Sequence, residues 1–93
     1  QMKTNIKNLK FGDQIKFTDH YHTVFNDQID CSNMYGLVVD VDNPTEKDKR
    51  QSIVIKLKSK KYQKDLEDFD NCVSFNFPDD EDYYNNIEVN LIK

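Results

Sequence analysis

Two stretches of the chain, residues 35–42 and 52–58, alternate between apolar and polar side chains, and a charged loop separates them. Alternation of this kind in β-branched residues predicts strands that cover a core with one face. The residues predicted to face inward are Tyr35, Leu37, Val39, Val41, Ile53, Ile55 and Leu57. Val38 and Val54 interrupt the outward polar rows, which favours burial of the sheet centre on both faces. The pattern predicts a central antiparallel hairpin.

Three further stretches alternate in the same way, at residues 14–18, 72–77 and 86–92. Pro78 ends the second of these, because proline cannot donate to a strand ladder. The residues predicted to face inward in these strands are Ile15, Phe17, Val73, Phe75, Phe77, Val89 and Leu91. Residues 2–9 show no clear period and are interpreted as a lead-in.

The remaining segments predict one short helix and one long loop. Tyr62, Leu66 and Phe69 have the i, i+4, i+7 spacing of an amphipathic helix of two to three turns. Its acidic end disfavours a long helix, because the helix dipole prefers cations at the C-terminus. We therefore expect a short, frayed helix or a turn. Residues 19–33 are polar and irregular, which predicts a long loop with a helical turn around residues 24–29, and long loops are often functional.

Together these elements predict one mainly β domain over residues 2–93, built as a five-stranded antiparallel barrel with one short helix. Gly-Asp at residues 12–13 precedes the first strand, and Tyr-Gly-Leu-Val-Val at residues 35–39 follows the long loop. These two segments resemble the first two strands of SH3-like barrels. An OB-like barrel is the alternative.

The composition is polar for a globular chain, with 37% apolar and 32% charged residues. An aromatic content of 12% and five alternating segments argue against disorder. The sequence has no apolar run long enough to cross a bilayer, so we expect no membrane contact. Gln1 precedes Met2, and we expect the natural chain to start at Met2. No signal-like stretch follows, which predicts a cytoplasmic protein.

The candidate metal ligands do not form a known pattern. Cys31 and Cys72 are too few for a disulfide framework and are interpreted as free thiols. With His20 and His22 they are ligand types for zinc, but their spacing matches no zinc finger. Residues 40–51 lack the glycine that a calcium loop requires. We therefore expect no metal and no other cofactor.

Catalytic motifs are missing from the sequence as well. The chain has two glycines in total, and it contains no nucleophile elbow, phosphate-binding glycine loop or His-Glu-x-x-His helix. We expect the protein not to be an enzyme.

Basic residues concentrate at residues 47–64, which hold eight of the thirteen. Lys56 and Lys58 project from one strand face. Acidic residues on both sides of the segment would repel phosphates, so solvated lysines that discourage edge pairing are favoured over direct nucleic-acid contact.

Residues 65–92 contain nine acidic residues and no basic one. Eight of the acids form two groups, and two tyrosines follow the second group. The candidate partner-binding residues are Asp65, Glu67, Asp68, Asp70, Asp79, Asp80, Glu81, Asp82, Tyr83 and Tyr84. Both groups flank the fourth predicted strand, so we expect them to share one side of the molecule. A concentrated negative field attracts basic surfaces, and tyrosine is a favoured interface residue.

The Asp-Asp-Glu-Asp-Tyr-Tyr tract at residues 79–84 is similar to acidic-aromatic tracts of small phage-encoded DNA mimics, the anti-restriction and anti-CRISPR proteins. The resemblance implies an inhibitor whose partner is a basic protein surface, such as that of a nuclease. Two alternatives remain open. One is a solvated acidic face without a partner. The other is an SH3-like structural or adaptor module that uses residues 19–33.

Overall fold

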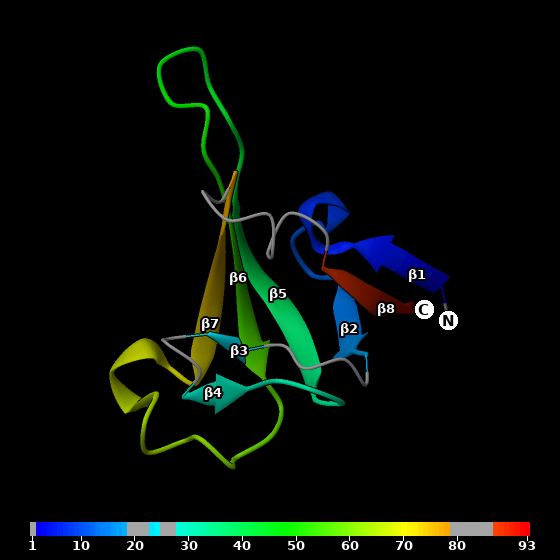
Figure 1. Cartoon of the computed structure of the whole chain (residues 1–93), viewed down its shortest axis with the longest axis vertical. Coiled ribbons are helices and arrows are strands. Elements are labelled where there is room, and N and C mark those ends of the chain that lie inside the picture. The colour runs from blue at the N-terminus through cyan, green and yellow to red at the C-terminus, as the bar shows by residue number, and fades with distance from the viewer. Residues whose placement is uncertain (1, 19–22, 25–27, 79–86) are drawn as a thin grey trace.

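The computed structural model of the chain describes residues 2–18, 23–24, 28–78 and 87–93, which form one large and one small antiparallel sheet. The large sheet has the spatial order β1-β8-β2-β5-β6-β7 (Figure 1). Its strands are β1 Met2–Asn5, β2 Gln14–Phe17, β5 Tyr35–Asp42, β6 Gln51–Leu57, β7 Cys72–Phe77 and β8 Glu88–Ile92. The small sheet pairs β3 Thr23–Val24 with β4 Ile29–Asp30.

The mainly β, antiparallel prediction is confirmed, and its five strands correspond to β2, β5, β6, β7 and β8. The count of five is wrong, because β1 adds a sixth strand beside β8. Within the described residues β1 and β7 are the two edges and do not pair with each other. The sheet is therefore open, and a closed barrel is not confirmed.

The lead-in to the first predicted strand has a structure of its own. After β1, the side chain of Asn5 accepts a hydrogen bond from the amide of Lys7 and caps the 3-10 turn η1, Ile6–Asn8. The amide of Ile6 donates to the carbonyl of Ile87 at 2.9 Å, and the side chains of Ile6 and Leu9 are buried. The segment thus closes one end of the core, which its irregular pattern did not indicate.

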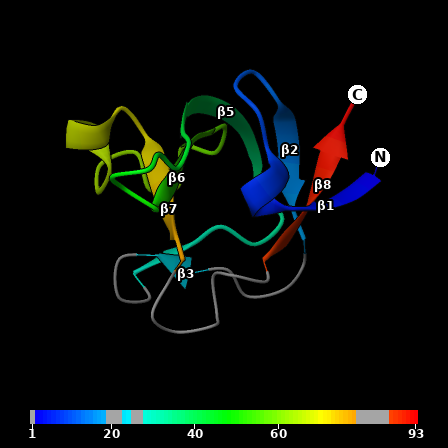
Figure 2. The ribbon, with the colours of Figure 1, turned by 90° about the horizontal axis from the view of Figure 1, so that it is seen from above.

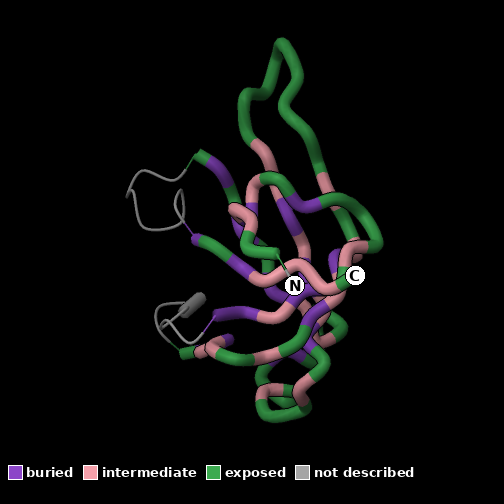
Figure 3. Tube along the Cα trace, turned by 90° about the vertical axis from the view of Figure 1, so that its right-hand side faces the viewer, coloured by how far each residue is buried: buried purple, intermediate pink, exposed green. Residues whose placement is uncertain are grey.

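Viewed from above, the large sheet bends into an arch, and β3 lies at its open side (Figure 2). The core fills the inside of this arch, and buried residues follow the strands in Figure 3. The buried core residues are Ile6, Leu9, Ile15, Phe17, Ile29, Cys31, Val38, Ile53, Ile55, Leu57, Leu66, Val73, Phe75, Phe77, Ile87 and Val89. Val41 and Leu91 are partly buried against them. Most of the predicted inward residues are thus confirmed, and the exceptions lie in β5.

A β-bulge in β5 reverses the predicted face of half of that strand. Val38 pairs with Ile55, but the next pair joins Asp40 to Val54, so Val39 is an extra residue. Directly opposed residues share a face, and Ile55 is buried, so Val38 points into the core. The prediction that Tyr35, Leu37 and Val39 face inward is therefore wrong. Beyond the bulge, the inward-facing position agrees again with the alternation predicted from the sequence, and Val41 packs against the core.

The two irregular segments also differ from their predictions. Val24 and Ile29, at the two ends of the predicted helical turn, are paired strand residues and not helical, and residues 25–27 lie outside the described residues. Residues 61–66 form turns rather than an amphipathic helix, and only the 3-10 turn η2, Glu67–Phe69, is helical. Leu66 is buried, whereas the Phe69 side chain is 58% exposed. Tyr62 is partly buried against the core, so two of the three residues of the predicted stripe, Tyr62 and Leu66, anchor the segment.

Candidate functional site

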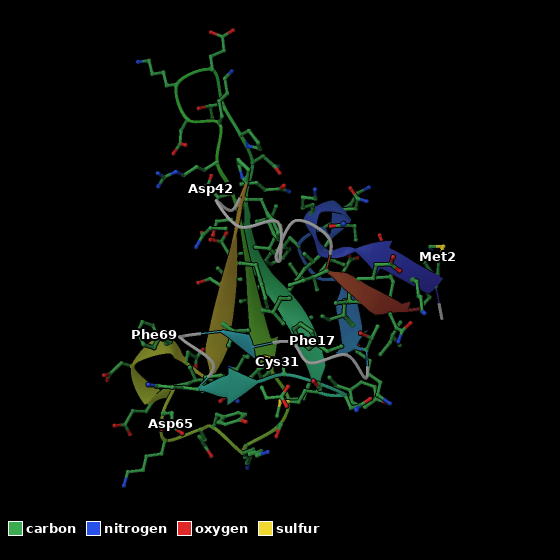
Figure 4. The ribbon with its side chains drawn as sticks, in the orientation of Figure 1. Met2, Phe17, Cys31, Asp42, Asp65 and Phe69 are labelled. Carbon is green, nitrogen blue, oxygen red and sulfur yellow. The ribbon has the colours of Figure 1, made fainter. Side chains whose placement is uncertain are left out.

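The first acidic group lies in the connection between β6 and β7, on a set of turns. The buried side chain of Leu66 anchors these turns, and its carbonyl accepts hydrogen bonds from the amides of Phe69 and Asn71 at 3.0 and 3.1 Å. All four carboxylate residues are exposed: Asp65, Glu67, Asp68 and Asp70. Figure 4 shows Asp65 at the outer edge of this connection. The turns therefore present the first group to solvent, as predicted.

Lysines surround the first acidic group and weaken its field. The same connection contains four exposed lysines, Lys58, Lys60, Lys61 and Lys64. Asp70 also pairs with Lys56 of β6, with 3.2 Å between the carboxylate oxygen and the ammonium nitrogen. Both side chains are exposed, so the pair contributes little stability. The connection is therefore close to electroneutral rather than an acidic surface.

The second group, Asp79, Asp80, Glu81 and Asp82 with Tyr83 and Tyr84, lies outside the described residues, so its role stays a prediction. The described chain reaches this group from Pro78, at the end of β7 opposite to the first group. A strand rises about 3.3 Å per residue, so the two ends of β7 are about 17 Å apart. The two groups are therefore attached to opposite ends of one strand.

The net charge of the chain comes from the second group. The sequence has seventeen acidic and thirteen basic residues, which gives a net charge of −4. Four of the acids are residues 79–82, and the rest of the chain has thirteen residues of each sign. An electroneutral domain thus carries one strongly acidic tract of four adjacent residues.

The two cysteines are free, and neither has the character of a nucleophile. Burial, and then the charge of Asp30, raise the pKa of the Cys31 thiol to about 12. The pKa of the Cys72 thiol is raised by partial burial and by Asp70, although Lys56 lowers it. A reactive cysteine needs a lowered pKa, so these two are structural.

The candidate metal ligands are only partly described. Among the described residues, His, Cys, Asp and Glu side chains form no group of three or more that could hold a metal ion. His20 and His22 lie outside these residues. The expectation of no metal and no cofactor therefore stays a prediction.

Two shallow hollows on the described surface were not indicated by the sequence, because segments that are distant in the chain line each of them. One of about 300 Å³ is lined by Gln14, Ile15, Tyr35, Gly36, Lys58 and Ile92. Another of about 420 Å³ is lined by Lys7, Asn8, Leu9, Lys10, Phe11, Val41, Asn43 and Gln51. Among the described residues, the exposed apolar side chains of Met2 and Phe69 lie on opposite sides of the molecule (Figure 4).

Comparison with family models, with curated proteins and with solved structures finds no match to this chain. The function is therefore argued from the chain's own residues. In the described part of the chain, no helix has the length and the apolar character needed to cross a membrane.

Proposed function

We propose that this chain is a non-enzymatic binding protein, in the manner of a phage or mobile-element inhibitor, that contacts the basic surface of a nucleic-acid-binding protein. The observation that carries the proposal is the concentration of the whole net charge in residues 79–82. Four adjacent carboxylates repel one another, and a cationic partner surface relieves this repulsion. Tyr83 and Tyr84 add contact area beside the charges.

The first acidic group has a smaller part in this proposal. Because lysines neutralise Asp65, Glu67 and Asp68 locally, these residues contribute to the rim of the contact rather than to its centre. Asp70 would have to leave Lys56 to meet a partner cation. A rim charge mainly affects the association rate, whereas a buried one affects equilibrium affinity.

The proposal is tested by charge reversal of the tract, with a matched reversal elsewhere. The test variant is Asp80→Lys with Asp82→Lys. The control is Asp42→Lys with Glu46→Lys, which makes the same charge change at two exposed residues of the β5–β6 hairpin. Each protein is used as bait in a lysate of the source organism at low and high salt, and a captured protein is then titrated by calorimetry.

We expect the wild type and the control to capture a basic protein at low salt and to release it at high salt. The tract reversal should weaken binding by about 2–5 kcal/mol, because each lysine would face a like charge. Equal affinity of wild type and tract reversal at low salt would refute the proposal.

An SH3-like adaptor module is the second candidate, and the strand order supports it. In the large sheet, neighbouring strands follow the chain order β2, β5, β6 and β7. The last strand, β8, pairs with the other side of β2. This meander fits an SH3-like half-barrel better than an OB-like one, which is a Greek key. If this alternative holds, substitution of Tyr21 or Phe25, which lie outside the described residues, should weaken partner binding. Substitution of residues 79–82 should leave partner binding unchanged.

A further inference from the structure

A row of lysines crosses the outer face of the large sheet. Lys3 of β1 and Lys16 of β2 both pair with Asn90 of β8, and Lys16 also pairs with Tyr35 of β5. The amide of Lys58, just beyond β6, donates to the carbonyl of Tyr35 at 2.9 Å. We call these five residues the lysine row. With about 4.8 Å between neighbouring strands, the row extends over about 19 Å.

Alternation places the row on the outer face. Ile15 and Phe17, on either side of Lys16, are buried, and so are Gly36 and Leu57, which adjoin Tyr35 and Lys58. Adjacent strand residues point to opposite faces, so the side chains of the row point away from the core. Within the described chain, none of the three lysines forms an ion pair.

Tyr35 gives this row an aromatic surface beside a hollow. Its side chain is 48% exposed, and the Lys16 ammonium lies 5.3 Å from the centre of its ring. The backbone of Ile15 and Gly36 lies beneath the hollow, because both residues direct any side chain inward. Gln14, Lys58 and Ile92 complete its lining. The hollow is therefore open and is bordered by the side-chain donors of Gln14 and Lys58.

The charge around the row is predominantly positive. Lys56 lies on the same face as Lys58, two residues earlier in the chain. The side chain of Asp70, with which Lys56 forms an ion pair, is 84% exposed. Glu88 of β8 is the acidic residue on this face nearest to Asn90 along the strand. A phosphate can compete for Lys56, because an exposed ion pair is weak.

We infer that the lysine row binds single-stranded nucleic acid, with phosphates along Lys3, Lys16 and Lys58 and a base over the hollow beside Tyr35. Proteins that bind single strands combine a basic track with an aromatic side chain on which a base stacks. A peptide of aspartate and glutamate would also be attracted to the lysines, but it carries no aromatic ring to stack on Tyr35. This inference goes beyond the proposed function, and it does not depend on residues 79–82.

The test measures fluorescence anisotropy of a labelled oligo(dT) of about twelve nucleotides, at about 50 and 200 mM salt. The test variant is Lys16→Ala with Lys58→Ala. The control is Lys47→Ala with Lys49→Ala, an equal charge change at exposed residues of the projecting hairpin. A second pair compares Tyr35→Ala with Tyr35→Phe, which keeps the ring.

We expect the wild type and the hairpin control to bind alike, and the Lys16, Lys58 variant to bind on the order of tenfold more weakly. Its salt dependence should be shallower by about 1.4, since each phosphate contact contributes about 0.7 on single strands. Tyr35→Ala should lower the affinity for oligo(dT) on the order of tenfold, and Tyr35→Phe should leave this affinity unchanged. Asp80→Lys with Asp82→Lys should not weaken this binding, which separates it from the proposed function.

Three results would overturn the inference. The first is no binding of oligo(dT) by the wild type at the lower salt. The second is equal loss in the row variant and the hairpin control, which would mean unspecific attraction. The third is binding of an oligoglutamate of equal length as tightly as oligo(dT), which would assign the face to an acidic protein. Circular dichroism of each variant establishes that it is folded.

Discussion

The rings of Phe17 and Phe75 have centroids 6.1 Å apart at an angle of 41°, although β5 and β6 separate their strands in the sheet. In a flat sheet, strands three positions apart would lie about 14 Å from each other. The two rings therefore meet across the inside of the arch. Their contact joins the β2 side of the sheet to its β7 edge.

Phe17→Leu and Phe75→Leu should each lower the free energy of unfolding by about 1–2 kcal/mol, because each leaves a cavity in a buried site. Combined, the two substitutions should cost less than their sum by about 0.5–1.5 kcal/mol, since an aromatic pair is lost only once. Urea unfolding of the four proteins measures this coupling. Strict additivity would mean that the rings do not stabilise each other.

Alternation in the sequence was sufficient to locate five strands, because period two in β-branched and aromatic residues is a local signal. It was not sufficient for β1, whose residues Met2–Asn5 have no such period and depend on pairing with β8. It also missed β3 and β4, since two-residue strands are too short to show a period. β1 is thus specified by a partner that is distant in the chain, whereas β3 and β4 pair with each other only a few residues apart in sequence.

The candidate sites illustrate the same limit. Exposure of Asp65, Glu67 and Asp68 was predictable from their position in a polar connection. The lysines that offset the charge of these acidic residues are present in the sequence. Only the structure shows that the lysines and the acids belong to one set of turns. The lysine row was not predictable at all, because Lys3, Lys16 and Lys58 come together only through strand register.

The bulge in β5 predicts an unequal response of two adjacent valines. Val38→Ala should destabilise the protein by about 1–3 kcal/mol, because the Val38 side chain is 1% exposed and contacts the core. Val39→Ala should cost less, since Val39 is the extra residue of the bulge and only half-buried. Thermal or urea unfolding distinguishes the two. A larger loss for Val39→Ala would restore the uninterrupted alternation expected from the sequence.

The Ile55 side chain of β6 occupies the space where a Cβ atom would lie at Gly36 of β5, so an added side chain should be costly. A Cβ atom at this position would lie 2.5 Å from Cγ2 of Ile55, which is less than any tolerated contact. Gly36→Ala should therefore lower the free energy of unfolding by about 1–3 kcal/mol. In an Ile55→Leu background the cost should be smaller, because leucine has no Cγ2. An equal cost in both backgrounds would place the strain elsewhere.

Cys31 should make stability decrease in alkaline solution. Burial, and then the charge of Asp30, raise the pKa of its thiol from 9.0 to about 12 in the folded protein. Between these values the unfolded chain has lost the thiol proton and the folded chain still holds it. The unfolded state binds fewer protons, so the free energy of unfolding falls as pH rises above 9. The contribution of this group is about 1.4 kcal/mol per pH unit.

The measurement is the difference in the free energy of unfolding between the wild type and Cys31→Ala, determined in urea at about pH 8 and pH 10, because contributions common to both proteins cancel in this difference. At the lower pH, Cys31→Ala should have a smaller free energy of unfolding than the wild type, because packing is lost. At the higher pH, this difference in free energy between the two proteins should be smaller by about 1 kcal/mol. Cys72→Ala is the matched control, and its difference should narrow less because Cys72 is only half-buried. A constant difference for Cys31→Ala would mean that the folded protein ionises this thiol as readily as the unfolded chain does.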